Sequence, residues 1–123
     1  MAKVYITGFQ VDTVFLLKQA LKRDNDITAE PGHAYPRERN DVYVIEHNPH
    51  LYPQSIASVQ FANTLGGRIL SIIPKQPIQS EDPEIAIPED PNVTKIREIS
   101  DKVIEYNDLL NTVPEAVKEL LNN

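Results

Sequence analysis

The hydrophobic positions of the first 75 residues form short apolar runs separated by polar turns, with strand-like and helix-like spacing in alternation. The strand-like runs are residues 3–9 (KVYITGF), 26–30 (DITAE), 41–47 (DVYVIEH) and 68–74 (RILSIIP). Apolar residues at helical spacing follow Asp12, which we expect to cap a first helix. A second helix is expected within residues 54–65, closed by the pair Gly66-Gly67.

This alternation predicts a parallel sheet whose connections cross over with a right-handed sense. The expected order is strand, helix, strand, strand, helix, strand. The fold class is therefore α/β, a small flavodoxin-like (half-Rossmann) parallel sheet with C-terminal helices. In such a sheet, ligands bind outside the carboxyl ends of the strands.

The composition changes after residue 75, which divides the chain into a core (1–75), a connector rich in proline and acid (76–91) and a C-terminal helical pair (92–123). We expect a long helix capped by Asn92, and a last helix over 115–121 opened by a capping box at 112–115. The apolar stripe of the long helix is Ile96, Ile99, Val103, Tyr106 and Leu110. That stripe fits packing on the sheet within the same domain, or a contact in a homodimer or higher oligomer.

Length and charge narrow the class of protein. The chain has 123 residues and no cysteine, which suits one domain without disulfides or zinc–thiolate sites. The net charge of −6 divides into +1 for residues 1–75 and −7 for residues 76–123. Because no cations cluster, we expect no binding to a nucleic-acid polymer. No apolar run is long enough to span a membrane, and the start leaves no room for a signal peptide, so we expect a cytoplasmic protein.

Candidate ligand-binding residues gather at the expected strand ends and at the start of the second helix. They are Gly8, Phe9, His47, Asn48, Ser55, Ser58 and Gln60. A helix N-terminus attracts anions, and residues 47–80 contain no Asp or Glu that would repel one.

The loop between the second and third strands adds further candidates. Arg37 and Arg39 could clamp phosphates, or form a solvated charge pair balanced by Glu38. Phe9 and Tyr35 could stack on a base, although Phe9 also suits plain core packing.

Three segments resemble a known family: KVYITGF, NDVYVIEHN and SIASVQFANTLGGRIL. They are similar to the small α/β folds of nucleoside 2-deoxyribosyltransferases and of TIR-like nucleotide N-glycosidases. The resemblance covers roughly residues 3–73, through Gly8-Phe9, Asp41, Ala62, Gly66 and Ile69. It implies a nucleotide-type small molecule as the ligand.

The family's helix carries a glutamate that stabilises the cation developing on the sugar, and this chain lacks it. Alignment on Ala62 and Gly66 places Ser58 there, or Gln60 after a slip of two residues. Neither is a carboxylate. If the protein is an enzyme after all, Glu46 or Glu30 at a strand end would have to substitute.

A metal site or a general base at Glu46–His50, with His33, is the remaining option. Two histidines and a carboxylate can bind zinc or iron, but Pro49 breaks the spacing that one helix face would need. We therefore predict no metal and no cofactor, and a structural hydrogen-bonding role for His47.

Three hypotheses follow. The first is a non-catalytic protein that sequesters or senses a nucleotide or nucleotide-derived small molecule. The second is a divergent deoxyribosyltransferase or N-glycosidase. The third is a protein–protein interaction module that acts through the C-terminal helices.

Overall fold

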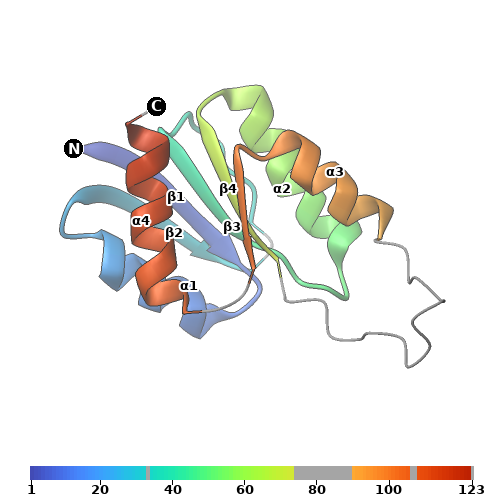
Figure 1. Cartoon of the computed structure of the whole chain (residues 1–123), viewed down its shortest axis with the longest axis horizontal. Coiled ribbons are helices and arrows are strands. Elements are labelled where there is room, and N and C mark those ends of the chain that lie inside the picture. The colour runs from blue at the N-terminus through green and yellow to red at the C-terminus, as the bar shows by residue number, and fades with distance from the viewer. Residues whose placement is uncertain (33, 74–89, 106–107, 123) are drawn as a thin grey trace.

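The computed structural model describes residues 1–32, 34–73, 90–105 and 108–122, and in these ranges it is an α/β flavodoxin-like fold (Figure 1). One five-stranded, fully parallel sheet has the strand order β2-β1-β3-β4-β5. The strands are β1 (Ala2–Gly8), β2 (Asn25–Pro31), β3 (Val42–Glu46), β4 (Arg68–Ile73) and β5 (Lys102–Glu105). The helices are α1 (Val11–Leu21), α2 (Tyr52–Leu65), α3 (Pro91–Ile99) and α4 (Leu109–Leu121). The expected fold class is confirmed.

The central strands are apolar on both faces because helices cover both. One face packs against α1 and α4, with Val4, Ile6 and Val44 in its core. The other packs against α2 and α3, and its core includes Tyr5, Tyr43, Ile45 and Ile69. Successive side chains of a strand point to opposite faces of the sheet, so each apolar strand contributes side chains to both cores.

The connection from β2 to β3 differs from the other connections, because its described residues contain no helix. Ile27 and Ala29 of β2 pack towards α1 and α4. The alternate residues of β2, on the side of α2, are Asp26, Thr28 and Glu30. No helix lies over them, which explains why that face of β2 is polar.

The prediction of a long helix from residue 92 is wrong, because the chain forms α3 and then β5 before α4 begins. Asp101 initiates the change: its backbone N–H donates to the Ile69 carbonyl (2.9 Å), and its carboxylate accepts from the Ile69 N–H (2.7 Å). β5 then pairs with β4, where Ile72 lies opposite Ile104. An uncovered edge of β4 would leave backbone groups unpaired, and this pairing outweighs the helical spacing of the apolar residues.

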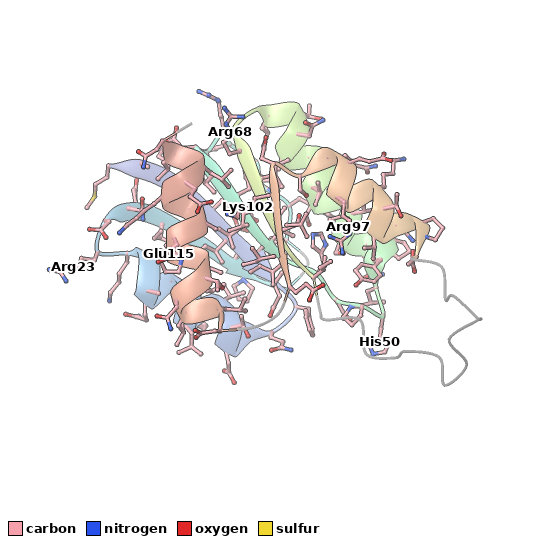
Figure 2. The ribbon with its side chains drawn as sticks, in the orientation of Figure 1. Arg23, His50, Arg68, Arg97, Lys102 and Glu115 are labelled. Atoms are coloured by element: carbon pink, nitrogen blue, oxygen red, sulfur yellow. The ribbon has the colours of Figure 1, made fainter. Side chains whose placement is uncertain are left out.

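The predicted helix starts also shift. α1 is preceded by Gln10 rather than by Asp12, and α3 is capped by Asp90, whose carboxylate accepts from the Asn92 N–H (2.8 Å). The capping box at 112–115 is wrong, since α4 starts at Leu109 and contains Pro114. Most of the predicted connector, like Tyr106 of the apolar stripe, lies outside the described residues. An ion pair joins Lys102 of β5, labelled in Figure 2, to Glu119 of α4.

Candidate functional site

The carboxyl edge of the sheet, where ligands were expected, is filled by the Glu46 side chain. Glu46 is the last residue of β3 and is only 2% exposed. One carboxylate oxygen, Oε1, accepts from the backbone N–H of Gln10 (3.1 Å), immediately before α1. A Cβ on Gly8 would lie 2.6 Å from that oxygen, so glycine is needed at the end of β1. The negative charge that suits the N-terminus of α1 is thus supplied by the protein itself.

His47 follows Glu46 and is fully buried in a chain of hydrogen bonds. Its Nδ1 lies 2.8 Å from the Ser55 hydroxyl, and its Nε2 lies 3.1 Å from the Ser71 hydroxyl. Ser71 is 2.7 Å from Ser100, and Ser55 donates to the Tyr52 carbonyl. Donation from Ser55 to the Tyr52 carbonyl is compatible with a proton on Nδ1 of His47. The network ties α2, β3, β4 and the end of α3 together.

At the start of α2, both expected hydroxyl donors already have partners within the protein. Ser55 bonds to His47, and Ser58 donates to the Ala34 carbonyl (3.0 Å). Asn48 forms a turn, where its side chain accepts from the His50 N–H. Phe9 is half-buried and Gln60 is exposed. A ligand role for these residues stays a prediction.

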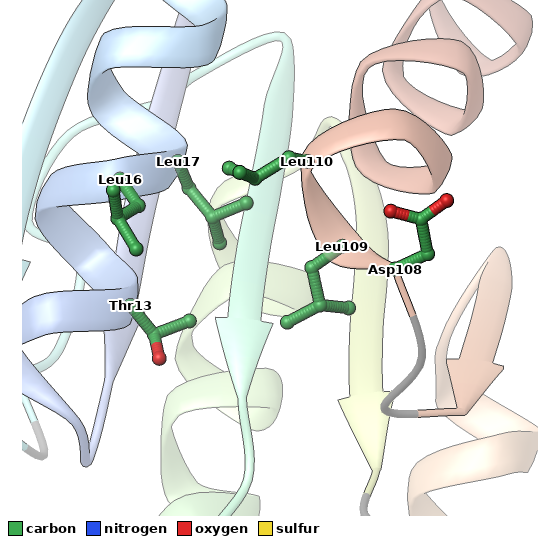
Figure 3. Close-up of a pocket in the computed structure, with 6 residues that line it drawn as sticks. All are labelled: Thr13, Leu16, Leu17, Asp108, Leu109 and Leu110. Carbon is green, nitrogen blue, oxygen red and sulfur yellow. The ribbon is translucent and has the colours of Figure 1, made fainter.

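A groove lies between α1 and α4, on the face of the sheet away from α2 (Figure 3). It has a volume of about 270 Å³. Leu17 and Leu109 are buried at its floor, whereas Leu16 and Leu110 at its rim are 53% and 50% exposed. The Thr13 hydroxyl, also in the lining, donates to the Gln10 side-chain oxygen (3.0 Å), which connects the groove to the Glu46 edge.

Two hollows adjoin each other at Arg37, beside the loop from β2 to β3. The larger, of about 560 Å³, is lined by Tyr35, Phe61 and Leu65 as well as Arg37. The smaller is lined mainly by polar and charged side chains. Arg39, the second arginine of the expected clamp, instead lies next to Gly66. The structure therefore brings together Tyr35 and Arg37, but not the two arginines at one hollow.

The smaller hollow has a volume of about 220 Å³, and Lys3, Tyr5, Glu30, Arg37 and Asn40 contribute to its lining. Tyr5 is 2% exposed, and among the described residues its hydroxyl has no hydrogen-bond partner. Burial raises the pKa of Tyr5 to about 12, the Glu30 carboxylate adds to the rise, and Thr7 and Arg37 oppose it.

The sequence reasoning missed Tyr5, Phe61 and the groove residues other than Leu110, which it placed on an apolar stripe. Phe15, Leu16 and Leu17 were the available signal for the groove, because three successive apolar residues cannot all face the core from one helix. Nothing comparable marked Tyr5, which reads as an ordinary core residue of a strand. Within the described part of the chain, no group of three or more metal-ligating side chains occurs, and no helix is long and apolar enough to cross a membrane.

Comparison with known proteins bears on the fold. No protein-family model and no curated protein matches the sequence. Among solved structures, the chain resembles a response regulator from Thermotoga maritima, with a TM-score of 0.64 and 12% sequence identity. The match covers 100% of this chain and 99% of the other. At this identity, the likeness shows a shared fold.

This comparison corrects two predictions. The expected kinship with nucleoside deoxyribosyltransferases and TIR-like proteins is wrong, since the structural neighbour is a response regulator. The expected sequestering or sensing of a nucleotide, which rested on that kinship, is wrong with it. The physical reason is that a strand ending in a polar loop before a helix is common to many α/β folds, so short motifs of this kind do not identify one family.

Proposed function

We propose that the protein is an interaction module of a signalling system, with a response-regulator-like fold, which self-associates through the groove between α1 and α4. The observation that carries the proposal is the pair of exposed leucines, Leu16 and Leu110, at the rim of that groove. Contiguous exposed apolar surface marks protein interaction sites. We further propose that the protein works in the cytoplasm.

The occupant to which we commit is a second copy of this chain. In and just after the last turn of α1, the cations Lys18, Lys22 and Arg23 outnumber the one acid, Asp24. On α4 and its cap, the acids Asp108, Glu115 and Glu119 outnumber the one cation, Lys118. Arg23 and Glu115 both project from the helical layer (Figure 2). A two-fold arrangement that sets α1 of one copy against α4 of the other pairs opposite charges around the leucines.

The hydrogen bonds from Glu46 through Gln10 to Thr13 support a groove of fixed shape. Glu46 accepts from the Gln10 N–H, and the Gln10 side chain accepts from Thr13 in the groove lining. The buried carboxylate therefore positions the first turn of α1, from which Leu16 is one turn away. A preformed groove lowers the cost of binding.

Sedimentation equilibrium over a wide range of protein concentration tests the proposal. We expect the wild type to dimerise, and Leu16→Glu and Leu110→Glu to raise the dissociation constant by roughly tenfold or more. Both side chains are half exposed, so the folded state should tolerate the change. The matched control is Leu121→Glu at the far end of α4, which should dimerise as the wild type does.

Two results would overturn this proposal. The first is a wild type that stays monomeric up to millimolar concentration. The second is a dimer that survives both groove substitutions, or one that Leu121→Glu weakens equally. A dimer that weakens as salt rises would support the contribution of the charged ends.

A further inference from the structure

The two hollows beside the loop from β2 to β3 lie on the opposite face of the sheet from the α1–α4 groove, because Tyr5 and Phe61 belong to the side of α2. Their origin is topological. The connection has no helix in its described residues, so among the described residues loop side chains cover part of the surface of β1 and β2. Arg37 lines both hollows, which makes them two compartments of one site.

The Tyr5 hydroxyl marks the polar compartment as a binding site. Buried polar groups in folded proteins almost always have a hydrogen-bond partner. Tyr5 is 2% exposed and lines the compartment, and its hydroxyl makes no hydrogen bond of ordinary geometry with a described residue. The Thr7 hydroxyl lies close enough to lower the pKa of Tyr5, but it already bonds to the Glu30 and Gly32 carbonyls. By contrast, the neighbouring Tyr43 hydroxyl, on a ring 6.2 Å from that of Tyr5, accepts from the Asn40 N–H and donates to the Gly66 carbonyl. A ligand that reaches Tyr5 would satisfy a buried hydroxyl that makes no hydrogen bond of ordinary geometry with a described residue.

The charges of the polar compartment are balanced. Lys3 and Arg37 supply two cations, and Glu30 and Glu38 supply two anions. None of these four side chains forms an ion pair with another described residue. Such a compartment suits a ligand that carries one charge of each sign and no net charge. It disfavours a nucleotide, whose phosphates would face two carboxylates.

The adjoining compartment is apolar and aromatic. Tyr35 and Phe61 lie with their ring centroids 5.1 Å apart, and Leu65 completes the wall. Phe61 is 52% exposed, so its ring is accessible to a ligand. At about 560 Å³, against about 220 Å³ for the polar compartment, this space takes the larger part of a ligand.

We propose that this site binds a free α-amino acid with a large apolar or aromatic side chain. The carboxylate of the ligand pairs with Arg37, its ammonium group pairs with Glu30, and one of its polar groups reaches the Tyr5 hydroxyl. The side chain lies against Tyr35 and Phe61. This inference does not depend on self-association, because it concerns the other face of the molecule.

Isothermal titration with L-phenylalanine and L-leucine tests the ligand class. Two matched probes each lack one charge of L-phenylalanine: 3-phenylpropionate has no ammonium group, and 2-phenylethylamine has no carboxylate. We expect the wild type to bind the amino acids and to bind each truncated probe roughly tenfold more weakly.

Variants assign the roles of the residues. Arg37→Gln should weaken L-phenylalanine binding by roughly tenfold while leaving 2-phenylethylamine almost unchanged, because that probe has no carboxylate to lose. Glu30→Gln should give the reciprocal pattern with 3-phenylpropionate. Tyr5→Phe should weaken binding without unfolding the protein. The matched control is Lys118→Gln on α4, which removes a charge on the other face and should leave binding unchanged.

Three results would overturn the proposal. The first is no heat and no NMR shift with any standard amino acid at millimolar concentration. The second is binding that Arg37→Gln and Glu30→Gln do not change. The third is equal affinity for L-phenylalanine and for both truncated probes, since binding would then be apolar and not zwitterionic. NMR shifts confined to β1, β2 and α2 would support the site. The test of dimerisation is independent of all these outcomes, because it concerns the other face of the sheet.

Discussion

Polar side chains are buried in two regions: Glu46 and His47 at the carboxyl edge of the sheet, and Tyr5 in the polar hollow. The two regions differ in how these side chains are hydrogen-bonded. At the edge, both ring nitrogens of His47 have hydroxyl partners, and Glu46 accepts from the Gln10 N–H. In the hollow, the Tyr5 hydroxyl has no hydrogen-bond partner among the described residues. The edge looks like a binding site by its place in the fold, but His47 and Oε1 of Glu46 serve the structure.

This difference teaches that position in an α/β fold is a weaker guide to a site than the state of its buried polar groups. A polar group that already has its partners stabilises the native state, and a ligand gains little from it. A buried group without a partner lowers stability and is available to a ligand. Each of the following predictions tests one half of this contrast.

The largest expected effect is that of Gly8→Ala, which tests how tightly the edge is filled. The new Cβ would lie 2.6 Å from a carboxylate oxygen of Glu46 and 2.7 Å from its Cβ. We expect the free energy of unfolding to fall by about 3 kcal/mol in urea denaturation. Gly32→Ala is the control: it meets no atom within 4 Å and has only a positive φ of 83°, so we expect about 1 kcal/mol. Equal costs would mean that Glu46 does not fill the edge.

His47→Leu tests the hydrogen-bonded chain of the edge. It leaves the buried hydroxyls of Ser55 and Ser71 without their imidazole partner. We expect the free energy of unfolding to fall by about 2 kcal/mol. His50→Leu changes an exposed histidine three residues away and should shift stability by less than about 0.5 kcal/mol. A neutral His47→Leu would contradict a structural role for this histidine.

Tyr5 and its neighbour Tyr43 should respond to the loss of their hydroxyls with opposite signs. Tyr43→Phe removes bonds to the Asn40 N–H (2.9 Å) and to the Gly66 carbonyl (2.9 Å), and should cost about 1 kcal/mol. Tyr5→Phe removes a buried hydroxyl with no partner in the described part of the chain, and should raise stability by about 1 kcal/mol. Thermal or urea unfolding of the two variants measures both. A loss of stability in Tyr5→Phe would show that its hydroxyl has a structural role.

The Tyr5 hydroxyl should also give the stability a pH dependence. Burial raises its pKa from 10.0 to about 12, so the native state keeps a proton that the unfolded chain releases above pH 10. Because the native state then binds more protons, stability falls as the pH rises from 10 towards 12, and the contribution is fully present below pH 10. Urea denaturation across this range should show a steeper fall for the wild type than for Tyr5→Phe. Parallel curves would contradict the prediction.

Sequence reasoning reached the candidate site only in part. It selected Tyr35 and Arg37 from an exposed loop, and Glu30 as the end of a possible strand; all three line the two hollows. It did not select Tyr5 or Phe61, because a tyrosine within a strand and a phenylalanine on a helix both read as core residues. Whether a side chain keeps an unpaired hydroxyl depends on atoms distant in sequence, such as those of Glu30 and Arg37.

The sequence by itself determined β1, β3 and β4, whose apolar runs fit only buried strands, and with them the flavodoxin-like class. Only the tertiary structure decided the path after residue 91. Ile96, Ile99 and Val103 satisfy helical spacing, yet the open edge of β4 provides backbone partners for Asp101 and β5 that a continued helix would not use. The spacing of apolar residues shows which element a segment can form alone. Which element it forms in the protein is decided by the unpaired edge of a sheet that other segments build.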